Sequence, residues 1–250
     1  MLLEAARRGV AAAAVAILRI YATPFEVRRK ADQSPVTLAD EEAERLIIAA
    51  LEQAAPDIPV IAEEQVAASG LPATLASRYW LVDPLDGTRG FVDHSDDFSI
   101  NVGLIENGWP VLGVIGVPMQ HLIYAAAGPG TATRQRNGGT PEKIAARLPP
   151  TKPVVLSSRL HGASRRVDAY LETVPGAVRR QMGSAFKFCL IAEGSADHYP
   201  RYGETCEWDT AAGQAIVEAA GGSVHTLEGT RLGYGKPGYR NPAFIARGRT

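Results

Sequence analysis

The chain has 250 residues, of which 46% are hydrophobic, enough to bury a substantial core in one large domain or two packed halves. Its 26 basic and 27 acidic residues nearly cancel, which argues against nucleic acid or an anionic membrane as a general partner. Cys189 and Cys206 lack the spacing of a metal site or a disulfide framework, as is typical of a reducing compartment. We therefore expect a globular cytoplasmic protein that recognises charged groups only locally.

The N-terminal segment superficially resembles a signal peptide, because Arg7 and Arg8 precede an apolar run at 10–18. Glu4 lies in the basic region, however, and Arg19 follows the run without a small-residue cleavage site. An alanine-rich helix packed on the core is therefore predicted. No other segment reaches the roughly 18 uninterrupted apolar residues of a membrane span.

Further along the chain, a second helix is predicted to begin near Thr37 and Asp40, which are start signals. A short strand at 58–64 ends in two glutamates, and small and polar residues at 65–77 predict a surface loop. Four apolar strands are then predicted between residues 80 and 127, with a hairpin turn at Asn107-Gly108.

The C-terminal part follows a segment at 128–153 that is rich in glycine, proline and basic residues and is predicted to separate two halves. Beyond it, strand and helix patterns alternate to the end of the chain. Such alternation favours an α/β layer.

The most informative segment is WLVDPLDGTRGF at 80–91, where a buried strand leads Asp83 and Asp86 into a tight turn. Mg²⁺ prefers oxygen ligands and commonly couples one or two carboxylates to a substrate phosphate. Gly87 and Thr88 would offer backbone N–H groups and a hydroxyl to that phosphate. The segment therefore suggests a magnesium site that binds a phosphate ester.

Other acidic residues could join this pair, but each has a second interpretation. Glu63 and Glu64 at a strand end could be solvated loop acids. Asp209 begins a predicted helix, and Asp40 lies at the start of another, so both could simply cap their own helices. From the residues alone these alternatives stay open.

Five segments together carry a resemblance to a known family: KADQSPVTLAD (30–40), IAEE (61–64), WLVDPLDGTRGF (80–91), GSAFKFCLIAEG (183–194) and PRYGETCEWDTAAG (200–213). In order and spacing they resemble the magnesium-dependent, lithium-sensitive phosphomonoesterases of the inositol monophosphatase superfamily. The segment at 183–194 is more similar to the bacterial 3′(2′),5′-bisphosphate nucleotidases within it. The resemblance implies a layered αβαβα sandwich, with an N-terminal α+β half at 1–148 that carries most metal ligands and a C-terminal α/β half at 149–250.

The implied metal centre contains two or more Mg²⁺ ions, held by oxygen atoms from both halves. Paired metals can stabilise the attacking and leaving oxygens of an in-line displacement. Asp83 would bridge the two ions. The implied ligands are the carboxylates of Glu63, Asp83, Asp86 and Asp209 and the main-chain oxygen of Leu85.

The resemblance also implies a catalytic pair, Thr88 hydrogen-bonded to Asp40. A threonine hydroxyl can accept a hydrogen bond from water and donate one to a carboxylate, so the pair could orient the attacking water and relay its proton.

The implied substrate is adenosine 3′,5′-bisphosphate, a nucleotide that the family links to sulfate assimilation. Lys187 and Arg159 are the plausible partners of its second phosphate, and Arg201 could contribute, although a single Lys or Arg is usually a solvated surface group. The implied substrate contacts are Glu63, Leu85, Asp86, Gly87, Thr88, Ser158, Arg159, His161, Ser184, Lys187 and Asp209.

One position departs from the nucleotidase pattern: Gly90 follows Arg89 where that pattern has an acidic residue, which could change substrate preference. An inositol or sugar phosphatase on the same fold is therefore an alternative, and a non-catalytic metal or nucleotide binding module is a more distant one. The resemblance leaves open a homodimer and a peripheral association with the inner membrane.

Overall fold

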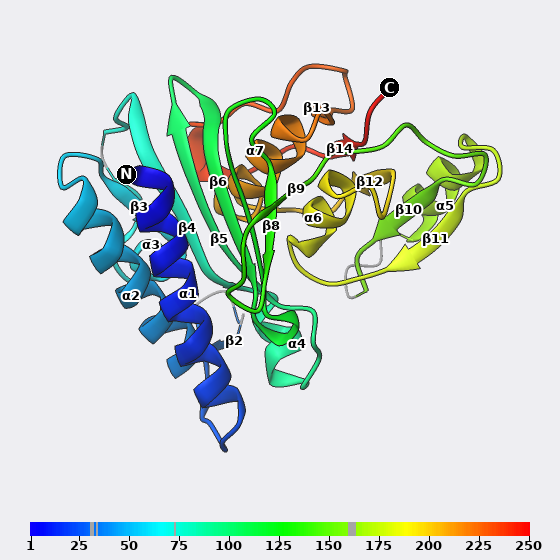
Figure 1. The fold of residues 1–250 in the computed structure, drawn as a ribbon. Coiled ribbons are helices and arrows are strands. Elements are labelled where there is room, and N and C mark those ends of the chain that lie inside the picture. Colours follow the sequence, from blue (N-terminus) through cyan, green and yellow to red (C-terminus); the bar gives the residue numbers. More distant parts are fainter. Residues whose placement is uncertain (31–32, 34, 73, 160–163) are drawn as a thin grey trace.

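The computed structural model describes the whole chain except residues 31–32, 34, 73 and 160–163. In Figure 1 the layers run from a pair of helices through a seven-stranded sheet, a second pair of helices and a five-stranded sheet to a last helix. The helices are, in that order, α1 (Leu2–Tyr21) and α2 (Leu38–Ala54), α6 (Phe186–Ala192) and α7 (Ala211–Ala219), and α5 (Ser164–Glu172). The layer order confirms the predicted sandwich.

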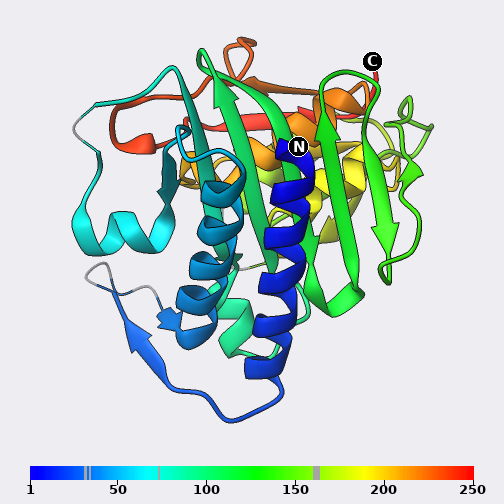
Figure 2. The same cartoon turned by 60° about the vertical axis from the view of Figure 1, so that its left-hand side comes forward.

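The N-terminal helix α1 is the predicted alanine-rich helix. Ala6, Val10, Ala13 and Ile17 recur at a spacing of three or four residues and are fully buried, so one face of the helix packs on the core. Figure 2 shows α1 and α2 side by side across one face of the large sheet. Within the described part of the chain, no helix has the length and apolarity needed to cross a membrane.

The large sheet is antiparallel except at one edge, where β3 runs parallel to β4. The turn at Asn107-Gly108 is confirmed as the β5–β6 hairpin, with φ of 51° and 80° at its two residues. In sheet order the strands are β3 (Val60–Ala62), β4 (Arg78–Asp86), β5 (Ser99–Glu106), β6 (Trp109–Val117), β7 (Leu122–Ala127), β8 (Thr133–Arg136) and β9 (Glu142–Lys143).

Helix α7 packs unusually close to the other face of this sheet. A Cβ atom added at Gly103 of β5 would lie 2.7 Å from Cβ of Ala211, and one at Gly113 of β6 would lie 2.3 Å from the main-chain oxygen of Ala212. The two glycines thus leave room for the first turn of α7. Because neither glycine has a side chain, α7 can lie close to the large sheet. The residues just before α7, including Asp209, lie close to the sheet as a result.

The small sheet is mixed, because β14 runs antiparallel between β12 and β13. Side chains alternate along β12: Tyr199 packs on Phe188 of α6 with ring centroids 5.3 Å apart, whereas Nδ1 of His198 lies 2.6 Å from the hydroxyl of Tyr170 in α5. The two helices therefore cover opposite faces. In sheet order the strands are β11 (Val178–Gln181), β10 (Val154–Ser157), β12 (His198–Arg201), β14 (Phe244–Arg247) and β13 (Ser223–Thr226).

Two segments differ from their predictions. The predicted loop at 65–77 begins inside a helix, α3 (Glu63–Ser69), and the predicted separator at 128–153 contains the strands β8 and β9. β8 and β9, the last two strands at one side of the large sheet, are polar and exposed or half-buried, so they lack the apolar alternation that marks a strand in a sequence. The strands β1 (Val27–Arg29) and β2 (Pro35–Thr37) form a separate two-stranded antiparallel sheet, and residues Thr88–Val92 form a short helix, α4.

Candidate active site

Strand register brings the first two acidic segments together. Ala62, the last residue of β3, pairs with Val82 of β4, so Glu63 at the start of α3 and Asp83 within β4 each directly follow a paired residue. Asp83 is 2% exposed, and its Oδ1 accepts the N–H of Leu85 at 3.0 Å. The sheet therefore holds Asp83 rigidly at the point where β3 ends.

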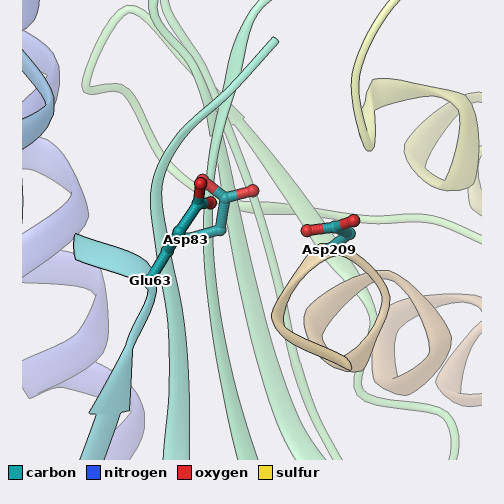
Figure 3. Close-up of side chains that lie close together, drawn as sticks. All are labelled: Glu63, Asp83 and Asp209. Carbon is teal, nitrogen blue, oxygen red and sulfur yellow. The ribbon is translucent and has the colours of Figure 1, made fainter. Parts of the chain in front are cut away.

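Asp209 reaches the same place from the other half of the chain. It ends a 3₁₀ turn, Glu207–Asp209, directly before α7, and its Oδ2 accepts the N–H of Cys206 at 2.9 Å. Carboxylate oxygens of Glu63, Asp83 and Asp209 all lie within 4.8 Å of one another. Figure 3 shows Glu63 and Asp83 side by side, with Asp209 facing them from the helical layer.

The electrostatics of this cluster fit a divalent cation. Burial, followed by the negative charges of Glu63, Asp86 and Asp209, raises the pKa of Asp83 well above its usual range. Burial and the charges of Asp86 and Glu63 do the same to the pKa of Asp209. A cation between these carboxylates would relieve the repulsion, and an all-oxygen ligand set suits a hard metal ion.

Asp86 lies at the border between this cluster and the start of α6. Its Oδ2 accepts the N–H of Ala185 at 2.5 Å and lies 3.5 Å from the hydroxyl of Ser99. Its charge acts on both Asp83 and Asp209, although it is not among the three carboxylates that converge within 4.8 Å. Asp86 therefore links the carboxylate cluster to the segment 183–188.

Lys30 contacts both glutamates at the start of α3, a role that was not predicted from the sequence. Its Nζ lies 2.7 Å from Oε1 of Glu63 and 2.6 Å from Oε1 of Glu64. Burial raises the pKa of Glu64 to about 7, although its hydrogen bond to Lys30 opposes that shift. The available signal was the position of Lys30 as the first residue of the family segment 30–40.

The structure brings Asp40 and Thr88 together. Asp40 is 1% exposed, and its Oδ1 accepts a hydrogen bond from Oγ1 of Thr88 at 3.0 Å, while that hydroxyl also lies 3.0 Å from the main-chain oxygen of Leu85. The other oxygen, Oδ2, accepts both the N–H and the hydroxyl of Thr37 at 2.8 Å. One carboxylate thus caps its helix and contacts Thr88 at the same time, so the two interpretations of Asp40 are compatible. The catalytic roles stay predictions.

A cavity of about 290 Å³ begins at Asp86 and Asp209 and extends between the two halves of the chain. Gly90 lines it as well. Three candidates, Glu63, Leu85 and Thr88, are not part of its described lining, and His161 lies outside the described residues. The predicted substrate contacts that line it are Asp86, Gly87, Ser158, Arg159, Ser184, Lys187 and Asp209.

Lys187 is the most buried cationic group of the cavity. It is 2% exposed, and its Nζ donates to the main-chain oxygens of Ser184 at 2.5 Å and Met182 at 3.2 Å. Burial lowers the pKa of Lys187 to about 7, although the charge of Asp86 opposes the shift. A bound anion would favour its protonated form.

Two arginines complete the cationic wall. Nη1 of Arg201 donates to the hydroxyl of Ser158 at 2.6 Å, and its Nε is buried without a hydrogen-bond partner in the described chain. Nη2 of Arg159 pairs at 3.0 Å with Oδ2 of Asp97, which also accepts the N–H of Gly183 at 3.0 Å. Asp97 was not predicted, and nothing in the pattern around it indicated this role.

The chain matches the family described as "Inositol monophosphatase family" over residues 2–248. It belongs to the inositol monophosphatase family. A curated relative, the 3′(2′),5′-bisphosphate nucleotidase CysQ of Salmonella typhimurium, is 42% identical over 232 residues, which cover 92% of each chain.

Solved structures of this family share the fold. CysQ from Bacteroides thetaiotaomicron matches with a TM-score of 0.82 at 32% identity, over 99% of this chain and 97% of that one. The inositol monophosphatase from Anabaena (Nostoc) sp. PCC 7120 matches with a TM-score of 0.77 at 25% identity, over 99% and 90%. The inositol monophosphatase family is metal-dependent, and among the described residues of this member the carboxylate cluster could bind the metal.

Proposed function

We propose that this family member is a Mg²⁺-dependent 3′(2′),5′-bisphosphate nucleotidase that hydrolyses adenosine 3′,5′-bisphosphate to AMP and phosphate. The observation that carries the proposal is the cavity that leads from Asp86 and Asp209 to Arg159, Lys187 and Arg201. A phosphate monoester needs only the carboxylate end, whereas a bisphosphate also needs cationic groups for its second phosphate. The 42% identity to a protein named as such a nucleotidase supports the same substrate.

The proposed metal ligands divide between two ions. Glu63, Asp83 and the main-chain oxygen of Leu85 would hold one, and Asp83, Asp86 and Asp209 would hold the other. When bound, Mg²⁺ would neutralise the phosphoryl oxygens and lower the pKa of the attacking water.

Thr88 and Asp40 would orient that water and take its proton. The hydroxyl of Thr88 can accept a hydrogen bond from the water while it donates its own proton to Oδ1 of Asp40 or to the main-chain oxygen of Leu85, each 3.0 Å away. Thr37 holds the other oxygen of Asp40, so the carboxylate cannot rotate away from Thr88. The pair would therefore fix the direction from which water attacks phosphorus.

The transferred phosphoryl group would lie on the backbone N–H groups of Gly87 and Thr88. Gly87 has φ of 93°, a conformation that glycine adopts readily and that allows the chain to turn from β4 into α4. Donors fixed by the backbone in this way stabilise charge without reorganising during the reaction.

The nucleotide would occupy the rest of the cavity. Lys187, Arg201 and Arg159 would neutralise the second phosphate, and Ser158 and Ser184 would hydrogen-bond to phosphate or ribose. The buried, unpartnered Nε of Arg201 supports an anionic ligand here, because a buried donor without a partner costs about 1–3 kcal/mol.

A phosphate-release assay with adenosine 3′,5′-bisphosphate and inositol 1-phosphate, each with and without Li⁺, tests the proposal. We expect Mg²⁺-dependent, Li⁺-inhibited release with a kcat/KM for the nucleotide well above that for the inositol ester. Comparable values would instead favour a broad inositol or sugar phosphatase, the second candidate, which the fold match to an inositol monophosphatase supports. No release from either ester would favour a binding module.

The cytoplasmic location, the homodimer and the membrane association stay predictions. Cell fractionation tests the first and the last, and analytical ultracentrifugation tests the second.

A further inference from the structure

Glu44 is a buried carboxylate with no part in the proposed reaction. It lies on α2 with only 5% of its surface exposed. It follows Asp40 by four residues, so the two side chains lie on the same face of the helix. Asp40 reaches Thr88, whereas Glu44 reaches the start of α3.

The contacts of Glu44 are with the backbone of the first turn of α3. Its Oε2 accepts the N–H of Glu64 at 2.8 Å, and its Oε1 accepts the N–H of Gln65 at 3.0 Å. N–H groups in a first helical turn have no partner within the helix. In the described structure Ala62 occupies the N-cap of α3 and provides no side-chain hydrogen bond, so Glu44 supplies the cap from another helix.

This cap lies where the chain passes from β3 into α3, next to Glu63. The pairing of β3 with β4 fixes the chain only as far as Ala62, opposite Val82. Glu63 is the first residue of α3, so the first turn of that helix sets where its side chain leaves the backbone, and Lys30 contacts the carboxylate at its far end. Two hydrogen bonds to the residues immediately after Glu63 fix that turn.

We propose that Glu44 is a positioning residue of the metal centre, which caps α3 from α2 and thereby holds the carboxylate of Glu63 beside Asp83. Through Asp40 and Glu44, one face of α2 would then set both the water-activating pair and a metal ligand. The inference rests on the proposed function, because that proposal assigns Glu63 as a ligand.

A residue that only stabilises the fold would behave differently. Loss of Glu44 would then lower the melting temperature without changing the affinity for metal. Groups that orient metal ligands typically change metal affinity or activity by about 10- to 100-fold when they are removed. The affinity for Mg²⁺ therefore separates the two roles.

The experiment is a calorimetric titration of substrate-free protein with Mg²⁺, for wild type, Glu44→Ala and Glu44→Gln. We expect binding about 10-fold weaker or more for Glu44→Ala. Glu44→Gln should have a smaller effect, since its amide oxygen can still accept one of the two N–H groups. The matched control is Glu42→Gln on the same helix, where the carboxylate pairs with Arg45 at 2.9 Å, and its Mg²⁺ affinity should equal that of wild type.

In the Glu44 variants, the Mg²⁺ concentration that gives half-maximal phosphate release should rise in parallel with the loss of Mg²⁺ affinity. Their kcat at saturating Mg²⁺ should stay within about threefold of wild type. A lower melting temperature with unchanged Mg²⁺ affinity in Glu44→Gln would overturn the inference, and this variant decides if Glu44→Ala does not fold. Wild-type protein that binds no Mg²⁺ would overturn both the metal centre and the role of Glu44. If wild type binds Mg²⁺ and Glu44 controls that affinity, failure to cleave the bisphosphate would refute the substrate alone.

Discussion

The two ends of the site are built in different ways. At the carboxylate end, the side chains lie at strand ends and helix starts, and the backbone and neighbouring helices hold them, as Asp83 and Asp40 show. At the cationic end, the groups come from β12, from α6 and from the chain beyond β10, and the side chain of Arg159 is 51% exposed. The carboxylate end can determine whether a phosphate ester is cleaved at all, and the cationic end can determine which ester is preferred.

The largest effect expected from this division is the loss of activity toward every ester in Asp83→Asn. Asp83 would contact both ions, so we expect kcat/KM to fall by about 10³-fold for adenosine 3′,5′-bisphosphate and inositol 1-phosphate alike. Phosphate release from the two esters checks this.

The melting temperature of this variant without Mg²⁺ is the control. It should not fall, because burial and the repulsion from neighbouring carboxylates, which raise the pKa of Asp83, both disfavour the charge that the substitution removes. Loss of activity toward only one ester would contradict the division between the two ends.

A smaller loss, again on both esters, is expected for Thr88→Ala. Removing the hydroxyl that contacts Asp40 should lower kcat by about 10²-fold and leave Mg²⁺ affinity unchanged, because the variant loses a proton acceptor rather than a ligand. Steady-state kinetics with a parallel Mg²⁺ titration measure both. Thr88→Ser keeps the hydroxyl and should retain most of the activity, whereas a nearly normal rate in Thr88→Ala would exclude the pair from catalysis.

The same division separates what the sequence could predict from what it could not. Short segments with local signals were predicted correctly as structure: Thr37 and Asp40 do form the capping box of α2, and Asn107-Gly108 does close a hairpin. Asp209 could be placed near Asp83 only through the family resemblance. The reason for that placement is a tertiary contact, in which Gly103 lets α7 approach the sheet.

The contacts that escaped prediction all depend on partners distant in sequence. Glu44 caps a helix that begins 19 residues later, so no pattern in the residues of α3 itself indicates that cap. Asp97 acquires its role only where Arg159 and Gly183 reach it from the other half of the chain. Glu44 did carry a weak signal, its position four residues after Asp40, which places both side chains on one helical face.

At the cationic end, Arg201→Ala should distinguish the two esters. Charged hydrogen bonds contribute about 1.5–3 kcal/mol, so we expect KM for adenosine 3′,5′-bisphosphate to rise by about 10- to 100-fold with kcat little changed. Inositol 1-phosphate lacks the second phosphate and should be cleaved as by wild type. Equal losses on both substrates would mean that Arg201 serves the fold or the cleaved phosphate, and the division would fail there.

The smallest expected effect is a dependence on pH that only the nucleotide should show. Burial lowers the pKa of Lys187 to about 7, so in the free enzyme its ammonium is mostly present at pH 6 and mostly lost at pH 8. Since only the protonated form attracts a second phosphate, kcat/KM for adenosine 3′,5′-bisphosphate should decline by up to about tenfold over this range, and kcat/KM reports the free enzyme.

Inositol 1-phosphate controls for the titration of the cleaved phosphate and of the carboxylate end, because both substrates share these groups. The ratio of the two kcat/KM values should therefore fall as pH rises through 7. In Lys187→Met the nucleotide should bind more weakly, and above pH 7, where the second phosphate is already a dianion because its second pKa is about 6, the ratio should no longer change with pH. A ratio that is already flat in wild type would show that Lys187 does not contact the second phosphate, and would leave Arg159 and Arg201 as the groups that select the nucleotide.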